Sequence, residues 1–225
     1  MLTRICIFLV FCAGMCGAAE PRSFDTSWIT DKPEVLTYRT SGKEGDGLYQ
    51  LSVWKTPDGI EAYINMITSG FTKSVSGTFA ADFRPRESKS RIIVNGQITM
   101  TTNCAYKPDL LHIATLMMPY NQVVENTLPV SDVVVDFSQA PFLPRILALR
   151  PGAEFIFSSL NPQSNSLVPL SIRVTGEEII HGSACFRIEG NDFEGRSTYW
   201  IEKDRPHRVM RIEQTGRVTE LILAP

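Results

Sequence analysis

The C-terminal third of the chain alternates apolar and polar residues with the two-residue period of β-strands. In "STYWIEKDRPHRVMRIEQ", residues 197–214, Tyr199 and Trp200 fall on opposite faces of one alternating run, and a second run begins at His207. Asp204 to Pro206 favours a turn between them, because Asp forms local hydrogen bonds and Pro cannot donate to a ladder. The pattern predicts a β-hairpin. Further alternating runs at 170–180, 184–191 and 218–224 extend it to an antiparallel meander of five strands.

The N-terminal half shows the same period in longer runs that are rich in β-branched and aromatic residues, at 47–56, 59–67, 70–83 and 90–107. Turn signals in "PDG", "SG" and "RPRESK" separate these runs. Helical periodicity is nearly absent. The best candidate is "SQAPFLPRILALR" at 138–150, which Pro141 and Pro144 limit to a short helix or a bent apolar segment. A curved sheet of about ten strands has a concave face to cover, and this segment can cover it as a plug.

The first 19 residues have the organisation of a secretory signal peptide. Arg4 precedes an apolar run from Ile5 to Cys12, and small residues close the segment before Glu20. Gly17 and Ala19 fit the positions that signal peptidase reads, so we expect cleavage between Ala19 and Glu20. The apolar run is too short to span a bilayer, which takes roughly 20 residues. Lipidation at Cys16 is the alternative, although Ala13 and Met15 stand where a lipoprotein signal usually has Leu and a small residue.

Charge and length restrict the function classes. The chain has 22 Lys and Arg against 24 Asp and Glu, so nothing in its balance favours nucleic acid or an anionic membrane surface. Residues 20–225 show no repeat of fixed period and no later apolar stretch of membrane length, and we expect them to form a single antiparallel β domain without a transmembrane segment. A domain of that size needs neither metal nor disulfide to fold.

Two cysteines remain once the signal peptide is removed. Cys6, Cys12 and Cys16 lie within it, which leaves Cys104 and Cys185 in the exported chain. In an oxidising compartment a pair of cysteines suggests one disulfide. The alternative is two separate buried thiols that behave as small apolar side chains. The sequence alone leaves both alternatives open.

The segment "VVVDFSQAPFLPRILALRPGAEFIF" and the hairpin after it carry a family resemblance. Together with "IRVTGEEIIHGSACFRIEG", "STYWIEKDRPHRVMRIE" and "GRVTELIL", it resembles the C-terminal half of a large family of exported bacterial domains of unknown function. Ser is usual in that family where Gln139 stands, and Ser138 lies one position away. The resemblance covers roughly residues 45–223, with the first half similar in strand pattern only. The matching positions are Asp136, Gln139, Arg150, Pro151, Gly152, Trp200, Pro206 and Arg211 to Glu213.

The tryptophan hairpin is also similar to that of the lipoprotein carriers LolA and LolB. What this resemblance implies is a single strongly curved antiparallel sheet, an incomplete barrel, closed on its concave side by one or two short helical plug segments. It further implies a periplasmic protein that can enclose an acyl chain, and it implies no catalytic residues. Trp200 is expected to be buried at the centre of the most regular hairpin.

A cluster of apolar residues in and after the plug segment is the candidate ligand-binding site. Its members are Phe137, Phe142, Ile146, Leu147, Phe155 and Phe157. The alternative, which is the favoured one, is that Phe137, Phe142, Phe155 and Phe157 simply fill the core of the sheet. We also expect the segment to act as a lid, because its prolines deny it a regular helical hydrogen-bond ladder and leave side-chain burial to hold it.

Catalytic signals are weak in this chain. His112, His181 and His207 stand singly, without a neighbour at metal-ligand spacing, and no nucleophile elbow is present. We therefore expect a protein that is not an enzyme and that uses neither cofactor nor metal. Two functions remain: a carrier or sensor of a lipid, acylated protein or other apolar ligand, and a structural or interaction module of the cell envelope that docks a partner protein.

Overall fold

The computed structural model describes residues 24–42, 45–130, 134–162, 164–192 and 195–222. The expected signal peptide, residues 1–19, lies outside the described residues. Strands of the first half are β1 (Glu34–Gly42), β2 (Gly47–Thr56), β3 (Gly59–Thr68), β4 (Phe71–Phe79), β5 (Pro85–Val94), β6 (Gln97–Tyr106), β7 (Leu110–Met117) and β8 (Gln122–Pro129). The second half contains β9 (Val134–Val135), helix α1 (Leu143–Ile146), β10 (Glu154–Asn161), β11 (Ser166–Ile180), β12 (Ser183–Asp192), β13 (Gly195–Glu202), β14 (Val209–Gln214) and β15 (Arg217–Leu221).

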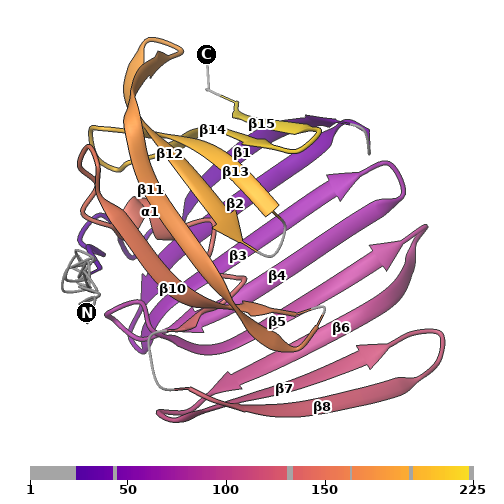
Figure 1. The fold of residues 1–225 in the computed structure, drawn as a ribbon. Coiled ribbons are helices and arrows are strands. Elements are labelled where there is room, and N and C mark those ends of the chain that lie inside the picture. The colour runs from indigo at the N-terminus through magenta and orange to yellow at the C-terminus, as the bar shows by residue number, and fades with distance from the viewer. Residues whose placement is uncertain (1–23, 43–44, 131–133, 163, 193–194, 223–225) are drawn as a thin grey trace, which may run out of the picture.

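All described strands belong to one sheet whose order is β8-β7-β6-β5-β4-β3-β2-β1-β15-β14-β13-β12-β11-β10-β9 (Figure 1). Neighbours are antiparallel except β9 and β10, which are parallel. The sheet does not close on itself, since β8 and β9 end the order. The mainly β architecture and the open sheet are as predicted, but the sheet has 15 strands rather than about ten.

The strand count was wrong because one predicted run contains a tight turn and because several strands lie outside the predicted runs. The alternation over 90–107 predicts one strand, but this run contains the end of β5, a turn and all of β6. Asn95 and Gly96 make that turn with φ of 51° and 79°. An Asn-Gly pair with two positive φ angles is the usual two-residue hairpin connection. Strands β1, β7, β8, β9 and β10 lie outside the predicted runs.

The C-terminal meander is confirmed, because β11 to β15 are successive neighbours in the sheet. Strands β13 and β14 form the predicted hairpin, with Thr198 opposite Glu213. Its turn is closed by the backbone amide of His207, which donates to the carbonyl of Asp204 at 2.9 Å. Trp200 is only 6% exposed, as predicted, and its Nε1 donates to Glu178 Oε2 at 2.9 Å.

The pairing of the first and last strands joins the two halves of the chain into one sheet. Strand β1 is antiparallel to β15, with Tyr38 opposite Leu221 and Thr40 opposite Thr219. Thr40 and Thr219 are buried, and their hydroxyl groups lie 3.1 Å apart. Strands from both ends of the sequence therefore form neighbouring parts of one concave wall.

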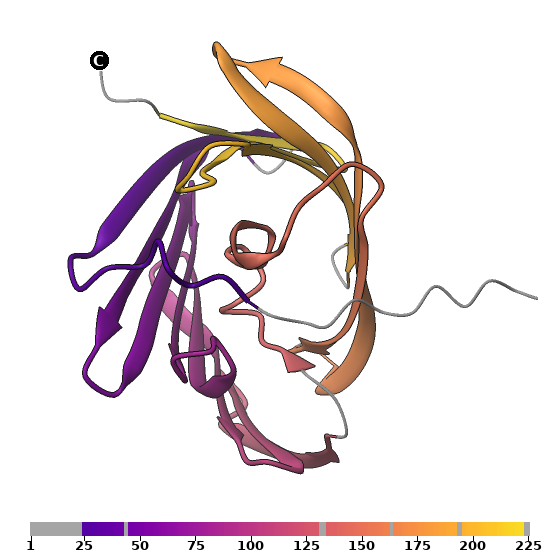
Figure 2. The ribbon, with the colours of Figure 1, turned by 90° about the vertical axis from the view of Figure 1, so that its left-hand side faces the viewer.

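The sheet curls around the segment that the sequence marked as a plug (Figure 2). Residues 136–147 pass through the hollow and include the four-residue helix α1, which has a proline in its first turn. Nearly every side chain of this segment is buried, and Phe142, Leu143 and Ile146 belong to the main apolar core. The placement agrees with the prediction that the concave face needs a cover. Within the described part of the chain, no helix has the length and apolar character needed to cross a membrane.

Candidate functional site

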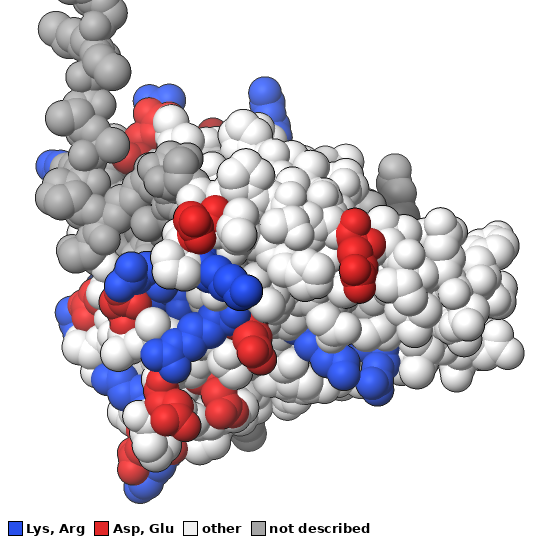
Figure 3. All heavy atoms as spheres, turned by 90° about the horizontal axis from the view of Figure 1, so that it is seen from below, with Lys and Arg blue, Asp and Glu red and all other residues white. Residues whose placement is uncertain are grey.

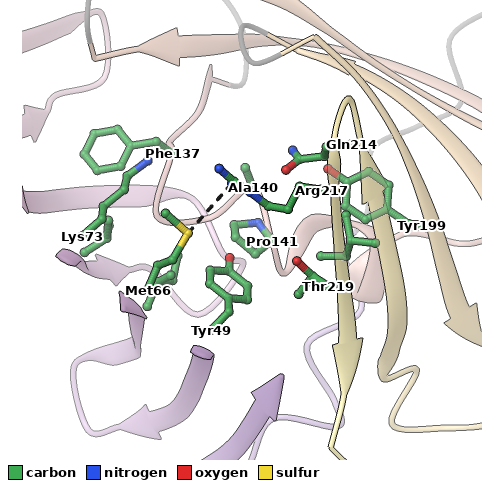
Figure 4. Close-up of a pocket in the computed structure, with 13 residues that line it drawn as sticks. Tyr49, Met66, Lys73, Phe137, Ala140, Pro141, Tyr199, Gln214, Arg217 and Thr219 are labelled. Carbon is green, nitrogen blue, oxygen red and sulfur yellow. Dashed lines mark hydrogen bonds between the residues drawn. The ribbon is translucent and has the colours of Figure 1, made fainter. Parts of the chain in front are cut away.

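A cavity of about 120 Å³ lies against the concave face of the sheet, next to the plug segment (Figure 4). Strands β2, β3 and β4 form one wall, β13, β14 and β15 form the other, and the plug closes one end. The lining residues are Tyr49, Ile64, Met66, Lys73, Val75, Phe137, Ala140, Pro141, Tyr199, Ile212, Gln214, Arg217 and Thr219.

The register of the strands explains why these side chains meet. Tyr49, Met66 and Lys73 are successive partners in one row across β2, β3 and β4. Ile64 and Val75 are partners in the next inward-facing row, and both are buried. Because side chains alternate between the two faces of a strand, residues two apart share a face. One face of β3 and β4 thus supplies both the buried floor of the cavity and its more exposed rim.

The opposite wall combines neutral polar and apolar side chains with one cation. Arg217 and Thr219 share a face of β15, and Arg217 pairs with Gln214 of β14 across the strand. The guanidinium Nη1 of Arg217 lies 3.9 Å from the sulfur of Met66, so the two walls approach each other here. Figure 4 shows Arg217 extending toward Met66 and Lys73 lying beside the ring of Phe137.

The end wall is fixed in place by the buried carboxyl group of Asp136. Its Oδ2 accepts hydrogen bonds from Ser88 Oγ at 2.8 Å and from the Tyr106 hydroxyl, which ties the plug to β5 and β6. Its Oδ1 accepts from the Ser138 amide at 2.7 Å and from the Ser138 hydroxyl. Burial raises the pKa of Asp136, while these hydrogen bonds act in the opposite direction by favouring the carboxylate.

Gln139 and Gly77 complete this anchor. The Gln139 side chain accepts from the Asp136 amide at 3.1 Å and donates to the carbonyl of Phe83 at 2.5 Å. Gly77 of β4 leaves room for the turn, since an ideal Cβ at that position would lie 2.3 Å from Ser138 Oγ. The polar residues at the start of the plug therefore hold its backbone against the sheet, and Phe137 projects from this fixed turn into the cavity wall.

Arg145 anchors the other end of the plug. Its guanidinium is buried and forms two contacts with Glu34 of β1, from Nη1 to Oε2 at 2.7 Å and from Nη2 to Oε1 at 3.1 Å. It also donates to the carbonyls of Pro206 and His207 at 3.0 and 3.1 Å. The group lies 3.8 Å from the centroid of the Trp28 ring. One side chain thus joins the plug to β1, to the turn after β13 and to residues before the sheet.

These two anchors do not favour the expectation that the whole segment swings out at modest cost. Buried polar contacts hold it at Asp136 and at Arg145, and backbone hydrogen bonds add to them. The amides of Ala140 and Arg145 donate to the carbonyls of Asp136 and Phe142 at 3.0 and 2.9 Å. Moving the segment would leave charged groups without their partners, which is expensive in a dry interior. The plug is better described as a fixed end wall.

Most of the six predicted ligand-binding residues lie in the core instead of the cavity wall. Phe137 lines the cavity. Phe142, Ile146, Leu147 and Phe157 are buried members of the apolar core, and Phe155 packs against that core while partly exposed. The sequence thus located the segment that borders the cavity, but most of the apolar side chains that marked it point into the packed interior.

The two cysteines are separate thiols, which is the second of the two alternatives. Cys104 lies on β6 and Cys185 on β12, and these strands are not neighbours in the sheet. Both side chains are buried. Burial, together with the nearby Asp136, raises the pKa of the Cys104 thiol to about 12. Burial also raises the pKa of Cys185.

The histidines occupy surface and turn positions. His112 is exposed on β7, and its Nδ1 lies 3.4 Å from the Thr127 hydroxyl. His181 and His207 have positive φ in the turns that follow β11 and β13. Among the residues that the structure describes, no three His, Cys, Asp or Glu side chains are grouped so that they could hold a metal ion.

The sequence pattern did not predict the two cations that line the cavity, Lys73 and Arg217. A signal was present, because Lys73 shares a strand face with the buried Val75, and Arg217 shares one with the buried Thr219. A charged side chain in an inward-facing position is more informative than another apolar one, since most charged residues stay on the surface. Recognising it required knowing which face of β4 and of β15 turns inward.

The sequence was also compared with known proteins. No model of a known protein family matches the chain, and no curated protein matches it. The resemblance to exported half-barrel domains therefore remains an expectation, and the functional argument depends on the cavity itself.

Proposed function

We propose that this protein is an exported, periplasmic binding protein without catalytic activity, which holds an apolar ligand such as a lipid or an acyl chain against the concave face of its sheet. The proposal takes residues 20–225 as one domain and residues 1–19 as a cleaved signal peptide. The observation that carries it is the cavity between the plug and the two walls of strands, with Ile64, Val75 and Phe137 in its lining.

The size and lining of the cavity suit part of an acyl chain. An engineered protein cavity of about 150 Å³ binds benzene, so a volume of about 120 Å³ is enough for a small apolar group. Each methylene group removed from water contributes roughly 0.8 kcal/mol, so a few methylenes in such a site give measurable affinity. Apolar walls with a few polar groups at the rim are the usual composition of a small-molecule site.

A cavity-filling substitution tests this function. Ala140 borders the cavity, so Ala140→Phe should occupy part of the volume and weaken binding of the apolar fluorescent probe N-phenyl-1-naphthylamine about tenfold or more. Ala81→Phe adds the same ring at an exposed site and serves as the control, which should bind the probe like the unaltered protein. Equal probe binding by all three proteins, measured by fluorescence titration, would place the probe elsewhere and contradict the proposal.

A second candidate function is a docking module of the cell envelope. Strand β8 ends the sheet order, and its hairpin with β7 carries Tyr120 and Val123, which are 80% and 59% exposed. Figure 3, which views the molecule from below, shows charged side chains gathered toward one end and a nearly uncharged surface toward the other. An exposed strand edge can add a strand from a partner. Val123→Lys should then abolish capture of a partner protein while leaving probe binding unchanged.

A further inference from the structure

Three hairpin turns lie together at one end of the sheet, on the right of Figure 1. They connect β3 to β4, β5 to β6 and β7 to β8, and these six strands are consecutive in the sheet order. Backbone hydrogen bonds join the three hairpins at this end. The Asn95 amide donates to the Gly70 carbonyl at 2.8 Å, and the Met118 amide donates to the Thr99 carbonyl at 2.8 Å. The turns therefore form one fixed surface, which we call the hairpin end.

Exposed apolar side chains are concentrated at the hairpin end. Each of the three hairpins contributes at least one of them, and their exposed fractions run from 38% to 80%. Single exposed apolar residues are normal on a protein surface, but a group of them on neighbouring strands marks an interaction surface. The members of the group are Ile67, Val94, Ile98, Met118, Tyr120 and Val123.

The hairpin end is also free of charged side chains. The stretches 62–72, 92–106 and 113–124 contain the three turns with their flanking strand residues, lie wholly within the described part of the chain and include no Lys, Arg, Asp or Glu. The turns at the opposite end of the same strands carry exposed charged side chains, namely Asp58, Asp82, Arg84, Lys107 and Asp109. Figure 3 shows this contrast between a charged end and a nearly uncharged one.

This composition favours the surface of a lipid bilayer over a protein partner. Turns without charged groups enter the headgroup region without the cost of removing charges from water. An exposed Tyr, with an apolar ring and a polar hydroxyl group, is typical of the boundary between membrane and water. A protein partner would gain specificity from charged groups across the interface, and these turns offer none. The same lack of charge removes any attraction to anionic lipids.

We propose that the hairpin end docks on a lipid bilayer, with its apolar side chains inserted among the headgroups of zwitterionic lipids and the charged end of the sheet facing water. Burial of apolar surface drives the docking. Met66 and Lys73 of the cavity rim lie two residues from the ends of β3 and β4, so this rim is at the same end of the sheet. The inference goes beyond the proposed ligand cavity and does not depend on it.

Flotation with vesicles of phosphatidylcholine measures the docking. Each methylene group removed from water contributes a factor of about four to the affinity. The double variant Ile98→Asp with Val123→Asp removes several such groups and adds two charges, so its partition coefficient should fall about tenfold or more. The matched control is Val35→Asp with Ile179→Asp, because these side chains are 52% and 76% exposed and lie near the opposite ends of their strands. The control should float like the unaltered protein.

A fluorescent label shows which end of the sheet meets the lipid. The environment-sensitive fluorophore NBD is attached to Tyr120→Cys at the hairpin end, or to Asp58→Cys at the opposite end, while Cys104 and Cys185 are buried. The label at position 120 should become brighter and shift to shorter wavelength when phosphatidylcholine vesicles are added. The label at position 58 should keep the emission that it has in water.

The lipid composition and the salt concentration complete the test. Docking should be as strong on phosphatidylcholine alone as on a mixture with phosphatidylglycerol, and it should persist at high salt. Absence of flotation, or flotation that needs phosphatidylglycerol and disappears at high salt, would overturn the proposal. An equal response of the two labels would also overturn it. Sedimentation of the protein as a dimer that only the Ile98 and Val123 variant dissociates would assign the surface to a second copy of the chain and refute docking on lipid.

Discussion

Replacing the buried Arg145 with Met should be among the most damaging single substitutions in this protein. The guanidinium contacts Glu34 twice, donates to two backbone carbonyls and lies against the Trp28 ring. Met retains an apolar stem of similar length, so the change removes the charge and the donors while keeping part of the packing. The carboxylate of Glu34 and both carbonyls would remain with no equivalent donor.

The size of the effect follows from what is left behind. Removing one partner of a buried ion pair destabilises a protein by roughly 3–5 kcal/mol. The side chain of Glu34 is 27% exposed, so water can partly solvate the remaining carboxylate and reduce that cost. Each carbonyl that stays dry without a donor adds about 1–3 kcal/mol. We therefore expect Arg145→Met to lower the free energy of unfolding by about 3–5 kcal/mol, a large part of the 5–15 kcal/mol typical of a domain.

Urea denaturation followed by tryptophan fluorescence measures this loss. Arg84→Met is a matched control, because Arg84 forms an ion pair with Asp82 at 2.6 Å in which both side chains are more than half exposed. Exposed pairs contribute about 0–1 kcal/mol, so the control should remain close to the unaltered protein. If Arg145→Met lost less than about 1 kcal/mol, like the control, the reasoning that Arg145 anchors the plug would be refuted.

Three further predictions concern buried groups. Trp200→Ala should cost about 3–5 kcal/mol in denaturant melts, as expected for a large buried ring, and a loss below about 1 kcal/mol would contradict its burial. Because burial raises the folded-state pKa of Asp136, its stabilising contribution is fully present below the unfolded pKa of about 3.9 and is lost as pH rises through the folded pKa. The difference in unfolding free energy between the unaltered protein and Asp136→Asn should therefore fall as pH rises. A difference that grows with pH would contradict a raised pKa for Asp136. Cys104 and Cys185 should both resist Ellman's reagent in the folded protein at pH 8 and both react after unfolding without reductant, whereas a disulfide would leave neither thiol to react.

Export has its own test in the mass of the mature protein. Cleavage after Ala19 predicts that intact-mass analysis of protein recovered from the periplasm gives a chain starting at Glu20. A diacylglycerol-modified chain starting at Cys16 would instead show a lipoprotein tethered to a membrane.

The local parts of the fold could be predicted from the sequence because they depend on nearby residues. The hairpin around Trp200 was found from alternation on both sides of the Asp204 to Pro206 turn. The Asn95-Gly96 turn is just as local, but the apolar residues on both sides of it gave the appearance of one long strand. Strand β8 carries exposed residues on the outer face and half-exposed ones on the other, so its alternation is weak.

The site could not be predicted in the same way, because it depends on long-range pairing. Lys73 and Arg217 line one cavity only because β1 pairs with β15 and joins the first strands to the last. No local pattern specifies that pairing. The polar anchors show the same limit: Asp136 contributed to a family resemblance, but its partners Ser88 and Tyr106 lie on strands more than 25 residues away. Nothing local in the sequence marks Arg145 as a buried anchor, since its partner Glu34 lies 111 residues away.

The central claim is that an apolar ligand such as an acyl chain occupies the cavity beside the plug. Photoaffinity labelling with a decanoate analogue that carries a diazirine at the end of its tail tests the claim most directly, with peptide mapping of the labelled sites. The account predicts saturable labelling in the peptides that contain Ile64, Val75 or Phe137, and loss of that labelling when excess decanoate competes. Labelling that is not reduced by decanoate, or that falls mainly on the outer face and the exposed edge around Val123, would contradict the account.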